Sequence, residues 1–121
     1  MILADTSVWI DHLRSGDARL TALLETGQIL AHPFVIGELA LGNLRQRNLV
    51  LARLRDLPEA ILATADDVQD FIERFSLMGL GIGFVDTHLL ASTCLTPDTA
   101  LWTRDKKLRE IAARLGLAGD S

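Results

Sequence analysis

The chain alternates short apolar stretches with longer segments in which apolar residues recur at every third or fourth position. The stretches at 2–4, 28–31, 60–63 and 100–103 have the length of buried strands, and the segments between them have helical periodicity. This alternation is typical of a layered α/β fold with a mostly parallel sheet. No internal repeat, low-complexity segment or linker interrupts it. We therefore expect a single domain over residues 1–121.

Caps and apolar stripes predict where the helices lie. Asp5 or Thr6 is expected to cap the first helix, Asp17 the second, and Asp66 a helix with an apolar stripe over 68–75. Pro33 suits a first helical turn, because the N–H that proline lacks has no partner there. Further helices are expected over about 33–44, 47–57, 85–94 and 108–115. Both tryptophans, Trp9 and Trp102, are expected in the core.

The composition excludes several classes of protein. Hydrophobic residues make up 49% of the chain, far more than a disordered segment carries. A single cysteine, Cys94, rules out a disulfide framework and a cysteine-based zinc site, which fits a reducing cytoplasm. The N-terminal apolar run is broken at Asp5, and no uncharged stretch has the length of a membrane span. We expect a soluble, cytoplasmic protein without a membrane partner.

Four acidic residues differ from the other twelve, which lie at caps, turns or polar helix faces. Asp5 ends the first predicted strand, and Asp105 directly follows the last one. Glu38 and Asp86 share helical faces with apolar residues, so we expect all four side chains to point toward the interior. Binding crevices in parallel α/β sheets form at the carboxyl ends of the strands, where these four acids would converge.

Converging carboxylates predict a hard divalent cation. Like charges at close range repel one another unless a cation neutralises them, and Mg²⁺ and Mn²⁺ prefer oxygen ligands. Such ions activate water for attack on a phosphodiester bond. Each acid also has a purely structural interpretation. Asp5, Asp86 and Asp105 would then be helix N-caps, and Glu38 would form a buried salt bridge with Arg45.

The net charge of −4 argues against a nucleic acid held by bulk electrostatics. Setting the four acids aside, however, leaves 12 acidic residues against 12 basic ones, and basic residues cluster over 45–55 and 104–109. These clusters are either solvated helix faces or contacts for RNA phosphates. The candidate RNA contacts are Arg45, Arg47, Arg104 and Lys106.

The same residues carry a family resemblance. The segments LADTS, ELALG, VDTHLLA and TRDKKL, which contain Asp5, Glu38, Asp86 and Asp105, resemble the four acidic motifs of the PIN domain. The opening DTSVWIDHLR and the chain length are most similar to the VapC toxins of bacterial toxin–antitoxin pairs. The resemblance extends over about residues 2–117.

This resemblance implies a three-layer α/β/α sandwich around a mostly parallel sheet and an endoribonuclease that depends on Mg²⁺ or Mn²⁺. It further implies a homodimer that cleaves RNA and is silenced by a cognate VapB-type antitoxin. The residues carried over by position are four acids for metal binding and catalysis, Asp5, Glu38, Asp86 and Asp105, and two supporting hydroxyls, Thr6 and Thr103.

Two other functions stay open at the level of the sequence. A phospho-acceptor receiver domain has a similar length and an acidic pocket, but it needs an aspartate after a mid-chain strand. Asp56 follows a helix-like segment instead. A noncatalytic module that binds RNA or protein would keep the same fold without depending on the four acids.

Overall fold

The computed structural model describes residues 1–119 of the chain. Three short strands and seven helices follow one another in this part of the molecule. In chain order they are β1 (Ile2–Ala4), α1 (Thr6–Ser15), α2 (Ala18–Glu25), β2 (Ile29–Leu30), α3 (Pro33–Ala40), α4 (Arg47–Arg55), α5 (Ala65–Phe75), α6 (Phe84–Leu95), β3 (Ala100–Trp102) and α7 (Lys106–Arg114).

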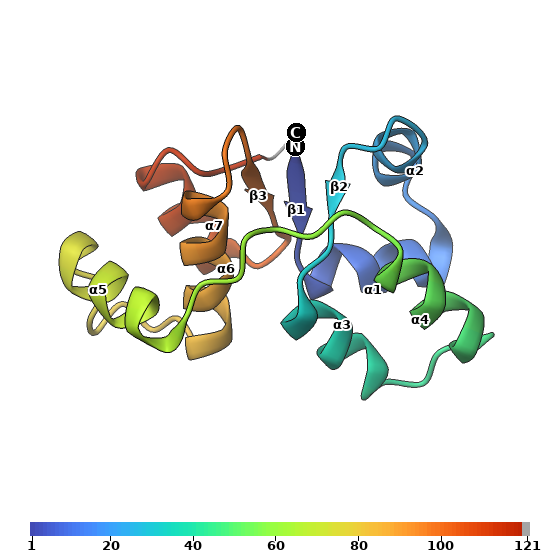
Figure 1. Cartoon of the computed structure of the whole chain (residues 1–121), viewed down its shortest axis with the longest axis horizontal. Helices are drawn as coiled ribbons and strands as arrows, with labels where there is room; N and C mark the ends of the chain where they lie inside the picture. Colours follow the sequence, from blue (N-terminus) through green and yellow to red (C-terminus); the bar gives the residue numbers. More distant parts are fainter. Residues whose placement is uncertain (120–121) are drawn as a thin grey trace.

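The strands form a parallel sheet in the order β2-β1-β3. Leu3 at the centre of β1 is paired with Leu30 on one side and Leu101 on the other. Helices α1 to α4 lie on one side of the sheet and α5 to α7 on the other (Figure 1). The expected three-layer α/β/α sandwich is thereby confirmed. No helix within residues 1–119 is long and apolar enough to cross a membrane.

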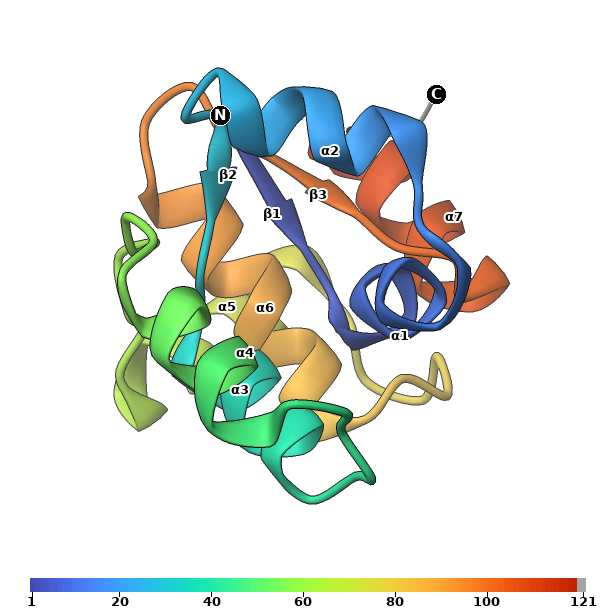
Figure 2. The ribbon, with the colours of Figure 1, turned by 90° about the vertical axis from the view of Figure 1, so that its right-hand side faces the viewer.

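Helices begin directly where strands end, which positions the polar residues at that edge of the sheet. A single residue, Asp5, separates β1 from α1, and its backbone N–H donates to the carbonyl of Trp102 at 3.0 Å. Figure 2 shows α1 following from the end of β1, beside the end of β3. Because the strands are parallel, the carboxyl ends of β1 and β3 lie at the same edge.

The core lies between the sheet and its two helical layers. Leu3, Val8, Leu90 and Leu108 are fully buried, and Trp9 and Trp102 are buried as expected. Helix α6 is the most enclosed element, with seven consecutive buried residues from 87 to 93. These buried residues anchor α6 in the core, and Asp86 lies just before them in its half-buried first turn.

The segment 60–63 is not the strand that the sequence predicts. Only Glu59, just before it, forms an isolated bridge, with Ala31. The backbone N–H of Ala63 donates instead to the Ser92 hydroxyl of α6 at 3.1 Å, and that of Ile61 to a threonine hydroxyl at the end of the same helix. Side chains of α6 therefore satisfy donors that a neighbouring strand would otherwise bind.

Several helix ends differ from the prediction by one to four residues: α4 ends at Arg55 and α7 begins at Lys106, and two further differences have a local cause. Helix α3 ends at Ala40, because the chain turns away at Leu41 and Gly42 before the predicted end at 44. The cap of α5 is Thr64 rather than Asp66. Thr64 and Asp67 form a reciprocal capping box in which each side chain accepts the other's backbone N–H, at 3.0 and 2.9 Å.

Candidate active site

Asp5 is a buried carboxylate whose two oxygens are both hydrogen-bonded. It is 5% exposed and caps α1, with Oδ1 accepting the backbone N–H of Ser7 at 2.9 Å. The Ser7 hydroxyl also donates to Oδ1, and the Thr103 hydroxyl donates to Oδ2 at 2.6 Å. The N-cap interpretation is thus correct as a description, but Asp5 is also held by a residue from the far end of the chain. Both contacts fix the direction in which its remaining lone pairs point.

The segment after β3 connects Asp105 to the same carboxylate. Thr103 is buried, and its Oγ1 accepts the backbone N–H of Asp105 at 3.0 Å while donating to Asp5. Asp105 caps α7 by accepting the backbone N–H of Leu108 at 2.9 Å, and its side chain is exposed. One hydroxyl, that of Thr103, therefore links two of the predicted acids.

Glu38 joins the group from a neighbouring helix. Helices α1 and α3 pack together, and the Thr6 hydroxyl donates to Glu38 Oε1. Glu38 is exposed and, within residues 1–119, makes no salt bridge. The buried Glu38–Arg45 pair is therefore absent. Glu38 also lines a cavity of about 610 Å³ between α1, α3 and α4, together with Arg45.

Asp86 is partly buried in the first turn of α6 and is not its cap, since Gly83 occupies that position. Burial raises the pKa of Asp86 to about 6, with further contributions from the negative charges of Asp5, Asp105 and Glu38. A carboxylate titrates higher when its charged form is desolvated and repelled. The three other acids therefore lie near enough to Asp86 for their charges to disfavour its ionised form.

The expectation that all four acids point away from water is wrong for two of them. Only Asp5 is buried, whereas Glu38 and Asp105 are exposed. The apolar residues beside these two acids, Leu39 and Leu108, are buried, but the acidic side chains themselves meet solvent. No three carboxyl, imidazole or thiol groups among the described residues are close enough to enclose a metal ion.

The donor set nonetheless fits a hard divalent cation in its chemistry. All of its donors are oxygens, as Mg²⁺ and Mn²⁺ prefer. None of the four acids has an ion pair with a basic side chain in residues 1–119. Glu38 and Asp105 are exposed, and each accepts one hydrogen bond, from the Thr6 hydroxyl and the Leu108 N–H respectively, whereas the buried Asp5 accepts three. The site thus combines one buried, firmly held carboxylate and two solvent-accessible ones with the partly buried Asp86.

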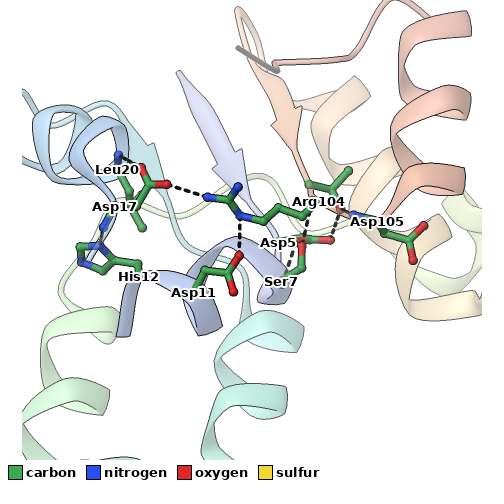
Figure 3. Close-up of polar contacts among 9 residues, drawn as sticks. Asp5, Ser7, Asp11, His12, Asp17, Leu20, Arg104 and Asp105 are labelled. Atoms are coloured by element: carbon green, nitrogen blue, oxygen red, sulfur yellow. Dashed lines mark hydrogen bonds and ion pairs between the residues drawn. The ribbon is translucent and has the colours of Figure 1, made fainter. Parts of the chain in front are cut away.

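The four predicted RNA contacts differ in whether a carboxylate already neutralises their charge. Arg45, Arg47 and Lys106 are exposed, and Arg47 makes one long hydrogen bond, to the Gly42 carbonyl at 3.4 Å. Arg104 is instead engaged with two carboxylates, Asp11 at 2.8 Å and Asp17 at 2.6 Å (Figure 3). Its guanidinium points away from Asp105 in that view.

Ser7 is a site residue that the sequence reasoning missed. Its hydroxyl donates to Asp5 and accepts the backbone N–H of Arg104 at 3.0 Å. The available signal was its place two residues after a capping aspartate, where a short hydroxyl side chain reaches the cap. Asp56, by contrast, lies exposed at the end of α4 and not behind a strand, so the receiver-domain hypothesis lacks its phospho-acceptor.

Comparison with known proteins agrees with this arrangement. The profile of the PIN domain family matches residues 2–114. Ribonuclease VapC32 of Mycobacterium tuberculosis, in strains CDC 1551 / Oshkosh and ATCC 25618 / H37Rv, is 48% identical to the chain over 118 residues. The aligned region covers 98% of this chain and 95% of each relative. This chain therefore belongs to the PIN-domain family, among the proteins of the VapC type.

Proposed function

We propose that this protein is a divalent-metal-dependent endoribonuclease, the toxin of a type II toxin–antitoxin pair. It acts in the cytoplasm as a homodimer and is neutralised by a cognate VapB-type antitoxin. The observation that carries the proposal is the buried carboxylate of Asp5, which the Ser7 and Thr103 hydroxyls hold at the carboxyl edge of the sheet, with Asp105 bound to the same Thr103 hydroxyl. The raised pKa of Asp86 supports it, because the charges of Asp5, Asp105 and Glu38 contribute to it. Acids from four separate elements near one edge of the sheet suit phosphodiester hydrolysis. The name of the relatives, Ribonuclease VapC32, supports RNA as the substrate.

Each residue has a distinct part in this proposal. Asp5, Glu38, Asp86 and Asp105 would hold Mg²⁺ or Mn²⁺, which supplies Lewis-acid stabilisation of the charge that develops on the phosphate. Ser7 and Thr103 orient the Asp5 carboxylate, and Thr6 orients Glu38. Glu38 and Asp105 are open to solvent, so they are the acids that water and an RNA phosphate reach directly.

The test is RNA cleavage by the purified, antitoxin-free protein. Cleavage with Mg²⁺ or Mn²⁺ should stop with EDTA and in Asp86→Asn, and it should persist in Asp70→Asn, a matched change on the exposed face of α5. Cleavage that survives EDTA would refute metal dependence. A folded wild-type protein that binds RNA yet leaves it intact with both metals would favour the noncatalytic binding module.

A further inference from the structure

Arg104 lies between Thr103 and Asp105, two residues of the site, but its side chain extends away from the site. From the end of β3 it extends over α1, where Nε pairs with Asp11 Oδ2 at 2.8 Å and Nη2 with Asp17 Oδ2 at 2.6 Å (Figure 3). Its guanidinium carbon also lies 5.8 Å from the centre of the Trp102 ring. An RNA phosphate approaching Arg104 would therefore meet a cation that two carboxylates already neutralise.

The backbone N–H groups of Arg104 and Asp105, unlike the Arg104 side chain, are linked to Asp5 through two hydroxyl groups. The Arg104 N–H donates to Ser7 Oγ at 3.0 Å, and the Ser7 hydroxyl donates to Asp5. The Asp105 N–H donates to Thr103 Oγ1 at 3.0 Å, and the Thr103 hydroxyl donates to the other oxygen of Asp5. A shift of segment 103–105 would therefore move the Thr103 hydroxyl and Asp105, and it would remove the N–H that holds the Ser7 hydroxyl toward Asp5.

The two carboxylates that bind Arg104 belong to elements that are themselves anchored. Asp11 is on α1, which begins at Asp5. Asp17 caps α2 by accepting the Leu20 N–H at 2.9 Å, and its own N–H donates to His12 Nδ1 at 3.0 Å. The Leu20 N–H and the Arg104 guanidinium lower the pKa of Asp17, so it is charged at neutral pH. The arginine side chain thus ties the segment after β3 to two fixed points.

We propose that Arg104 is a positioning residue, which braces segment 103–105 against α1 and α2 and so sets the geometry of Asp5 and Asp105. The inference rests on the RNA hydrolysis proposed above, and it replaces the expectation that Arg104 contacts RNA. Side chains of Arg104 and Asp11 are 42% and 49% exposed, so that pair contributes little to global stability. Asp17 is less exposed, at 18%, but asparagine there keeps the cap of α2, so both variants should fold.

The test uses Arg104→Met and Asp17→Asn. Asparagine at 17 can still cap α2 through its oxygen, but it then presents an N–H₂ group to the guanidinium, which breaks the pair. Matched controls are Arg114→Met at the far end of α7 and Asp70→Asn on α5, neither of which touches the site. Steady-state cleavage gives kcat and KM, and amide hydrogen exchange of the metal-free protein reports on the N–H groups of residues 104 and 105.

If Arg104 braces segment 103–105, kcat and amide exchange should change in the same direction in Arg104→Met and Asp17→Asn. We expect kcat to fall by about tenfold to about a hundredfold while KM stays within about twofold, because a displaced site loses reactive geometry and not affinity. The two amides should exchange faster in both variants than in the controls. A rise in KM for Arg104→Met, with a lower KM for Asp17→Asn because the guanidinium then keeps only one of its two carboxylate partners, Asp11, would overturn the proposal and make Arg104 an RNA contact.

The two proposals can fail separately. Wild-type cleavage with unchanged kinetics and exchange in both variants would refute the brace and leave the nuclease intact. Absence of metal-dependent cleavage in the wild type would refute the nuclease, and amide exchange would then decide the brace alone. Faster exchange at residues 104 and 105 would support it, and unchanged exchange would overturn it.

Discussion

Asp86→Asn is expected to stabilise the metal-free protein while abolishing its activity. The pKa of Asp86 is raised from 3.8 to about 6 by burial and by three neighbouring acids. At about 1.4 kcal/mol per pKa unit, the shift corresponds to about 3 kcal/mol against the ionised form. Partial exposure and the favourable dipole of the α6 N-terminus reduce the net gain expected for asparagine to about 1–2 kcal/mol.

The stability gained by Asp86→Asn should increase with pH. A carboxyl group with a raised pKa contributes stability that is fully present below its unfolded value of 3.8 and lost as pH rises through about 6. The wild type therefore carries the full cost at pH 8 and about a third of it at pH 4.5, where the unfolded carboxyl group is mostly ionised and the folded one is not. Asparagine does not titrate, so its advantage over the wild type should be about three times larger at pH 8 than at pH 4.5.

The assay is thermal unfolding of both proteins in EDTA, with Asp70→Asn as the control. We expect the Tm of Asp86→Asn to exceed that of the wild type by about 5 °C at pH 8. Added Mn²⁺ should raise the Tm of the wild type more than that of the variant. A lower Tm for Asp86→Asn at pH 8, or an equal gain at both pH values, would refute the electrostatic account of this residue.

Three further results are expected. Thr103→Val keeps the shape of a buried side chain but leaves Asp5 short of one donor, so unfolding by urea should show a loss of about 1–2 kcal/mol and cleavage should fall at least about tenfold. Burial lowers the pKa of His32 to about 4, so stability is present above 6.5 and is lost as pH falls toward 4. The free energy of unfolding should therefore drop between pH 7 and pH 4.5 more steeply in the wild type than in His32→Asn. Thr64→Ala removes the cap of α5 and should cost about 1 kcal/mol in the same urea titration, with cleavage unchanged.

The site was predictable where a local pattern fixed both position and direction. Asp5 follows a three-residue strand and opens a helix, and those two facts alone place its carboxylate at the carboxyl edge of a parallel sheet. Asp105 repeats the arrangement after β3. Their convergence needed no long-range information beyond the alternation of strands and helices.

The features that could not be predicted from the sequence depend on contacts between residues far apart in the chain. The segment 60–63 has strand-like residues, but its N–H groups bind hydroxyls of α6, about thirty residues away. Arg104 belongs to a basic cluster in the sequence, yet its charge is used by Asp11 and Asp17. Tertiary contacts decide whether a charged side chain is paired, and the spacing of residue types along the sequence does not reveal those contacts.

The most direct test of the central claim is a crystal structure of the protein soaked in Mn²⁺, with anomalous scattering recorded at the manganese edge. We predict an anomalous peak among the carboxylates of Asp5, Glu38, Asp86 and Asp105, with Ser7 and Thr103 still bound to Asp5, and no such peak in Asp86→Asn. A wild-type crystal with its manganese elsewhere, or with the same peak after Asp86→Asn, would contradict the assignment of these four acids as the metal site.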